Sequence, residues 1–168
     1  MKIFFFILTQ FLFFVSCQPG TDSTLETKKE IKLSAGLKPI VDSLVKFNVV
    51  HDDAIGYAAV KSNVYLNFKK FMAKATDDEL INLTDHDSAT VRAYSFWVLA
   101  KRKNPKVKDL LSKHLYDSAS FFYLSGCTGG EEKINEFYLN LLTPNYLDLS
   151  TLKLTPEEVE NFQKKIGH

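Results

Sequence analysis

Residues 76–103 read TDDELINLTDHDSATVRAYSFWVLAKRK, and this sequence predicts two helices joined by a short acidic turn. Thr76 and Glu79 have the spacing of a capping box, in which the Thr hydroxyl accepts from a free amide and the Glu carboxylate accepts from the Thr amide. The sequence DHDS at 85–88 supplies turn formers and an N-cap residue for the second helix. A helical hairpin of this kind buries one face only when neighbouring segments stack on it.

The second helix of this hairpin is apolar on nearly all sides. Val91 and Tyr94 lie on one side of it, and Phe96 and Leu99 lie on others. Because a helix half in water needs a polar face, the pattern predicts a central, buried helix. The sequence KRKNP at 101–105 then places cations at its negative end and a Pro just beyond it.

A repeat pattern runs across the turn of the hairpin. Leu80 and Leu83 precede the turn, Asp87 lies in it, and Val91 and Arg92 follow it. This order resembles a HEAT-type helical repeat. The resemblance implies that stacked units join through a ladder of hydrogen bonds between their Asp and Arg side chains.

A second copy of the pattern follows in the next segment. The sequence DSATV at 87–91 recurs as DSASF at 117–121, and Phe122 stands where the second copy would have its Arg. Over residues 56–142 the chain is similar to uncharacterised bacterial lipoproteins with a HEAT-like core. That family implies a fold and no assigned activity.

The flanking segments also favour helices. We expect an all-α fold, a short α-α superhelix of HEAT-like units in a single domain. In this interpretation residues 51–53 form a turn, 55–60 a short helical piece and 125–130 a flexible loop, while 146–154 is the one segment with a weak strand pattern.

The N-terminus predicts export and lipid attachment. Lys2 is followed by an apolar run over residues 3–15 that is too short to span a membrane, and then by Ser16 and Cys17. This ending resembles a bacterial lipobox, which implies removal of residues 1–16 and a lipid on the sulfur of Cys17. The alternative is a buried N-terminal helix with a chance Cys.

The expected domains follow from that cleavage. Residues 17–35 would be the lipidated Cys and a flexible tether, and residues 36–168 the helical domain. The tether could instead be a frayed first helix over 25–33. We expect a lipid-anchored protein of the bacterial cell envelope that faces the periplasm.

The charge balance bears on partners. Residues 1–16 contain one Lys and no acid, so the remaining chain has 20 basic and 20 acidic residues. A neutral chain argues against a nucleic-acid partner, which normally requires a basic surface. The lipid on Cys17 would then supply the membrane attachment. We also expect no cofactor.

Two clusters of His and acids are the main candidates for chemistry. They are His51-Asp52-Asp53 and Asp85-His86-Asp87. If the fold brought His51, Asp52, His86 and Asp87 together, they could bind a metal or support hydrolysis. The alternative is that both clusters are turn and cap residues. His114 could be a third ligand, or a cation at a helix end.

Cys127 is the one Cys that remains after lipidation of Cys17, so no intramolecular disulfide is expected. It lies between glycines in a predicted loop, where a thiol could react. The alternative is a small buried hydrophobic side chain.

Aromatic residues are numerous and could line a groove for a partner. Those with this potential are Tyr57, Tyr65, Tyr94, Trp97, Phe121, Phe122, Tyr123 and Tyr138. We single out Tyr57, Tyr94, Trp97 and Phe122 as candidate partner contacts. The alternative is that these side chains pack in the core.

Three functional interpretations follow. The first is a membrane-anchored helical-repeat lipoprotein that binds or scaffolds another envelope protein and has no catalysis of its own. The second is a metal-binding or hydrolytic enzyme that uses the clusters at His51 and His86. The third is a structural or stress-linked lipoprotein without a dedicated ligand.

Overall fold

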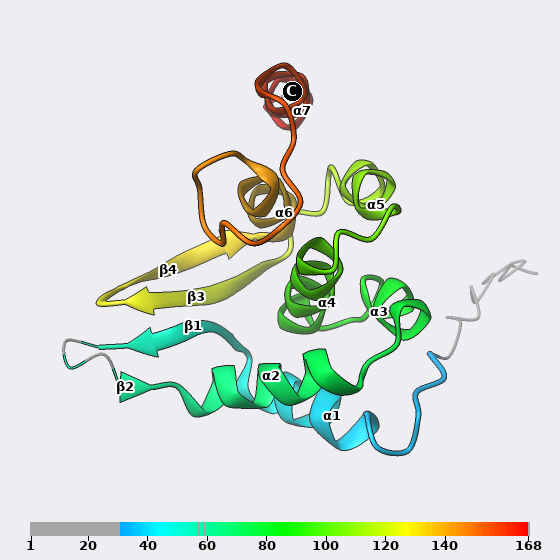
Figure 1. Cartoon of the computed structure of the whole chain (residues 1–168), viewed down its shortest axis with the longest axis vertical. Helices are drawn as coiled ribbons and strands as arrows, with labels where there is room; N and C mark the ends of the chain where they lie inside the picture. The colour runs from blue at the N-terminus through cyan, green and yellow to red at the C-terminus, as the bar shows by residue number, and fades with distance from the viewer. Residues whose placement is uncertain (1–30, 57, 59, 168) are drawn as a thin grey trace, which may run out of the picture.

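The computed structural model describes residues 31–56, 58 and 60–167 (Figure 1). Cys17 and Tyr57, two of the residues singled out above, lie outside these ranges. Within them the chain forms seven helices and four strands, which are α1 Lys38–Phe47, β1 Val49–Ile55, β2 Val60–Lys61, α2 Asn63–Lys74, α3 Asp77–Leu83, α4 Ala89–Lys101, α5 Val107–Lys113, β3 Ser120–Gly126, β4 Thr128–Lys133, α6 Ile134–Leu142 and α7 Pro156–Ile166. None of the helices in these ranges has the length and hydropathy needed to cross a bilayer.

Helix α4 is the centre of the fold, as the sequence predicts. Ten of its 13 residues are buried. It packs against α1, α3, α5, α6 and both central strands (Figure 1). Aromatic rings line these contacts: Phe96 stacks on Tyr138 of α6 with 3.7 Å between ring centroids, and Phe68 of α2 lies 4.5 Å from Tyr94. A helix without a polar face is thus enclosed by helices and strands together.

The predicted capping box is confirmed at α3. At α3 the Thr76 hydroxyl accepts from the Glu79 amide, and the Glu79 carboxylate accepts from the Thr76 amide at 2.9 Å. Thr155 and Glu158 form the same capping box at α7. Ser88 is the N-cap residue of α4, but its side chain makes no capping hydrogen bond.

The prediction of an all-α fold is wrong, because a four-stranded mixed sheet lies beside the helices. Its strand order is β2-β1-β3-β4. The central strands β1 and β3 are parallel, and each edge strand is antiparallel to its neighbour. The expected turn at 51–53 lies in β1, and the expected loop at 125–130 is a hairpin.

The prediction of a HEAT repeat is also wrong, and the two copies of its pattern show why. Asp87–Val91 begins helix α4, whereas Asp117–Phe121 leads into strand β3. In the second copy, Phe121 is buried on the sheet and packs edge-on against Phe137 of α6 at 5.1 Å. Similar residues therefore start a helix in one place and a strand in the other, because tertiary packing overrides local preference.

The segment 146–154, expected to be extended, forms no strand. Backbone hydrogen bonds hold it instead, from Leu152 N to Ala100 O at 2.9 Å and from Leu154 N to Leu142 O at 2.8 Å. Asp148 fixes its middle by accepting hydrogen bonds from Trp97 Nε1 at 2.8 Å and from Lys101.

The Asp148 carboxylate is held in its charged form. Burial alone would raise its pKa, but hydrogen bonds from Lys101, Ser150 and Trp97 outweigh that effect and keep the pKa well below its ordinary value. The loop between α6 and α7 is thereby pinned to α4.

We predict that Leu99→Ala in α4 lowers the free energy of unfolding by about 2–5 kcal/mol, because Leu99 is fully buried and its removal leaves a cavity. Urea unfolding followed by circular dichroism measures the change. Leu149→Ala is the matched control, since Leu149 is 71% exposed and its loss should change stability by less than about 0.5 kcal/mol. Equal effects of the two substitutions would contradict the central position of α4.

Candidate functional site

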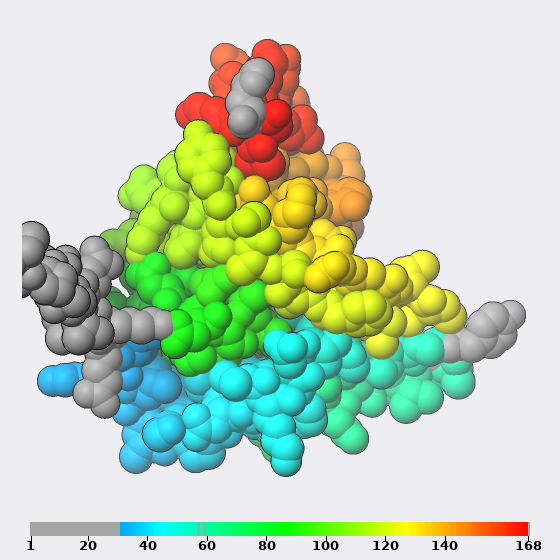
Figure 2. Space-filling view, turned by 180° about the vertical axis from the view of Figure 1, so that it is seen from behind, coloured from blue at the N-terminus to red at the C-terminus, as the bar shows by residue number. Residues whose placement is uncertain are grey.

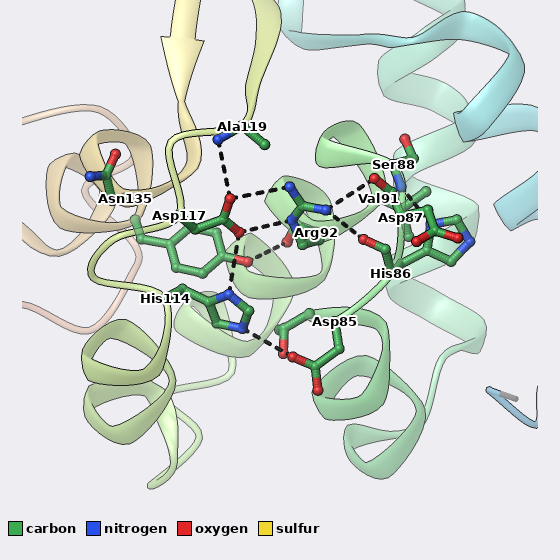
Figure 3. A network of polar contacts seen from close by, with 12 residues as sticks. Asp85, His86, Asp87, Ser88, Val91, Arg92, His114, Asp117, Ala119 and Asn135 are labelled. Carbon is green, nitrogen blue, oxygen red and sulfur yellow. Dashed lines mark hydrogen bonds and ion pairs between the residues drawn. The ribbon is translucent and has the colours of Figure 1, made fainter. Parts of the chain in front are cut away.

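Arg92 on α4 lies at the centre of a polar network (Figure 3). Its Nη1 donates to the backbone oxygens of His86 at 2.6 Å and Asp87 at 3.0 Å. Its Nη2 donates to Asp117 Oδ1 at 3.3 Å, and Nε lies 3.0 Å from Asp117 Oδ2 as an ion pair, without the angle of a hydrogen bond. One guanidinium thus joins the turn before α4 to the segment before β3.

His114 extends the network from the end of α5. Its Nδ1 lies 3.3 Å from Asp117 Oδ2, and its Nε2 lies 3.4 Å from Asp85 Oδ1. Burial lowers the pKa of His114, against the opposing effect of Asp85 and Asp117. The neutral imidazole is therefore favoured.

The contacts of this network connect elements of the fold to one another. Asp117 also accepts from the Ala119 amide at 3.2 Å, and Tyr138 donates to the Arg92 backbone oxygen at 3.0 Å. The side chains of Arg92 and His114 are only 11% and 10% exposed. Since Arg92 and Asp117 bind each other, neither is available to a substrate in this structure.

A cleft of about 870 Å³ opens beside the turn that carries His86. Its walls come from residues 31–33, α1, α3 and that turn. Charges of both signs line it, with Lys38 and Asp42 on α1 paired to each other at 3.2 Å. The His86 ring is oriented by the Ser88 amide, which donates to its Nδ1 at 3.0 Å.

The other His-acid cluster lies on β1. His51 Nδ1 is 2.7 Å from the Ser62 hydroxyl, and the His51 amide donates to the Tyr94 hydroxyl at 2.8 Å. Burial lowers the pKa of His51. In some hydrolases a His in contact with a Ser acts as the base that activates the Ser nucleophile. Here, however, Ser62 is only 2% exposed, and its hydroxyl oxygen caps α2 by accepting from the Tyr65 amide.

The candidate metal ligands are spread over different elements. His51 and Asp52 follow each other along a strand and so point to opposite faces of the sheet, and Asp52 accepts from Ser125 at 3.0 Å. His86 and Asp87 lie in the turn before α4. Among residues 31–56, 58 and 60–167, no three His, Cys, Asp or Glu side chains form a group that could hold a metal ion.

The aromatic candidates for partner contact divide in two. Tyr94 is fully buried and Trp97 is 3% exposed, as in the core-packing alternative. Phe122 is 49% exposed on the outer face of the sheet. Of these three, only Phe122 is placed to meet a partner.

The hairpin of β3 and β4 is a feature that the sequence did not reveal. It projects beyond the helices in Figure 1, and Figure 2 shows it in yellow beside the cyan of β1. Cys127 lies at its tip as an exposed free thiol. The run of apolar residues at 121–124 does not alternate, and the glycines at 129 and 130 favour a loop, so only the short GC turn could have indicated a hairpin.

Comparison with known proteins gives no assignment. No protein-family model matches the chain, and no curated protein matches it. The functional conclusion must therefore come from the molecule itself.

We predict that Asp117→Asn lowers the free energy of unfolding by about 3 kcal/mol, because it leaves the largely buried Arg92 charge without its partner. Chemical denaturation measures the loss. Asp42→Asn in the exposed pair with Lys38 is the control and should cost less than about 0.5 kcal/mol. If both variants were equally stable, the Arg92 network would not hold the fold together.

We predict that His114 makes the free energy of unfolding decrease at acidic pH. Its pKa is lower in the folded chain than in the unfolded chain, so the unfolded state takes up the proton first. The stability from this residue is complete above the unfolded pKa of about 6.5 and falls as the pH drops toward the folded pKa.

The comparison of wild type with His114→Gln at about pH 7.5 and about pH 5.5 isolates this effect. The wild type should lose more stability on acidification than the variant does. Burial also lowers the pKa of His51, with the same sign, so both chains keep His51 and its contribution cancels. Equal acid sensitivity of the two proteins would contradict the prediction.

Proposed function

We propose that this protein is a binding module of the bacterial cell envelope, anchored to the membrane by a lipid on Cys17 and without catalysis of its own. The anchor rests on the N-terminal sequence, from Lys2 through the apolar run to Cys17. The helical and mixed-sheet domain would then present a surface to another envelope protein on the periplasmic side. The neutral charge argues against nucleic acid as that partner.

One observation carries the binding role: a hairpin extends from the body of the domain with a half-exposed aromatic side chain. Phe122 is 49% exposed on β3, although the same chain buries Phe121, Tyr94 and Trp97 almost completely. Exposed aromatic residues are enriched in protein interfaces. The His-acid clusters, in contrast, bind neighbouring elements of the fold.

The proposal predicts that a photoreactive amino acid at position 122 captures one envelope protein in living cells. Tyr146 is the matched control position, because it is 50% exposed and lies in the loop between α6 and α7. The yield at 122 should exceed that at 146 by about tenfold if the interface is specific. Cells that make the full-length chain provide the sample, and mass spectrometry identifies the captured protein.

Three outcomes would contradict parts of this function. Equal capture at positions 122 and 146, or no capture at either, would favour a structural lipoprotein without a dedicated ligand. Cys17→Ser should also move the protein from the membrane fraction to the soluble fraction. If it stayed in the membrane fraction, the lipid anchor would be wrong.

A further inference from the structure

Within residues 31–56, 58 and 60–167, strand β4 is an edge of the sheet and pairs on one side, with β3. The Gly126 oxygen accepts a hydrogen bond from the Gly56 amide at 2.8 Å. Because backbone groups alternate in direction along a strand, the even-numbered residues of β3 direct their N–H and C=O groups toward β1. The odd-numbered residues direct theirs toward β4. With the observed register, Gly129, Glu131 and Lys133 of β4 direct theirs away from the sheet. These three residues are exposed, and the amides of all three and the carbonyls of Gly129 and Glu131 point away from β3 without a strand beside them in the described part of the chain, whereas the Lys133 carbonyl stands at the N-cap of α6.

An apolar surface lies directly beside this edge. A Cβ atom at Gly129 would lie 2.8 Å from Leu124 Cδ1 and 3.1 Å from two ring carbons of Phe122. The Phe122 and Leu124 side chains thus lie across the Gly129 backbone, and a larger side chain at position 129 would have to displace them. The Phe122 ring is half-exposed, so every second side chain of a strand added to β4 could pack against it.

The charge of the edge is acidic. Glu131 and Glu132 point to opposite faces of β4, and Glu131 accepts from the Ser120 hydroxyl at 2.6 Å. Burial, and then the charge of Glu136, raise the pKa of Glu132. A basic side chain nearby would lower the pKa of Glu132 and so oppose both effects. A second copy of β4 would instead bring two further glutamates close to those of the first.

We propose that the free edge of β4 binds an extended segment of a partner protein by strand addition, and that this segment alternates apolar residues with Lys or Arg. The main-chain groups of Gly129, Glu131 and Lys133 pair with it, Phe122 contacts its apolar side chains, and Glu132 on the opposite face selects its charge. This inference rests on the proposed binding function and names the chemistry of the partner.

The test uses two capped heptapeptides, Thr-Val-Lys-Val-Lys-Val-Thr and Thr-Val-Glu-Val-Glu-Val-Thr, with the full-length chain in detergent micelles. Amide hydrogen exchange by NMR locates the contact, and titration gives the affinity. The Lys peptide should protect the amides of Gly129, Glu131 and Lys133 and bind about tenfold more tightly than the Glu peptide.

Variants at Glu131 and Glu132 separate the backbone from the charge. Glu131→Pro removes an outward amide that β3 does not use, and it should abolish protection. Glu132→Lys leaves the backbone intact and reverses the charge on the face opposite Phe122, so it should remove or reverse the preference for the Lys peptide, even if the Pro variant failed to fold. Glu157→Lys on α7 makes the same charge change on a distant exposed residue and should have no effect.

Equal binding of the two peptides, protection at other amides, or an unchanged preference in Glu132→Lys would overturn the inference. Its failure is distinct from failure of the proposed function. If position 122 captures an envelope protein in cells while neither peptide protects β4, the binding function stands and strand addition falls. If the Lys peptide protects β4 but no partner is captured in cells, the edge binds as inferred and the envelope function falls.

Discussion

The constraint on which the structure depends is that α4 has no side it can turn to water. Ten of its 13 residues are buried, and their side chains point in every direction around the helix axis. Each neighbouring element therefore has to contribute apolar surface to it. Helices alone do not close this enclosure, because β1 and β3 complete it beside α2 and α6. The sheet is part of the same core.

Polar side chains near this core connect α4 to the segments that lead into or follow other elements. Arg92 binds the turn before α4 and the segment before β3, and Asp148 binds two side chains of α4. Several residues of the two His-acid clusters also bind neighbouring elements: His51 contacts Ser62, Asp52 accepts from Ser125, and Asp85 pairs with Lys113. The open sheet edge beside Phe122 is the surface that we propose for a partner.

Short sequence patterns predicted the features of the fold that depend on residues close together in the chain. The capping box at Thr76 and the burial of α4 follow from patterns within a few residues, and the structure confirms them. The sheet could not be predicted in this way, because β1 carries His51-Asp52-Asp53, a typical turn sequence, and becomes a strand only by pairing with β3. The exposure of Phe122 and the burial of Tyr94 likewise depend on which face packs against a distant element, which periodicity does not reveal.

The parallel pairing of β1 with β3 has a consequence for the order of folding. Val50 pairs with Tyr123, about 70 residues further along the chain, so the loop between them must close before the centre of the sheet exists. The β3–β4 hairpin closes through a two-residue turn and can form within microseconds, ahead of that long-range contact. Until β1 arrives, the hairpin has two open edges. A folding chain therefore passes through a stage in which the open edge of β3 is as accessible to another strand as the edge of β4 is in the folded molecule.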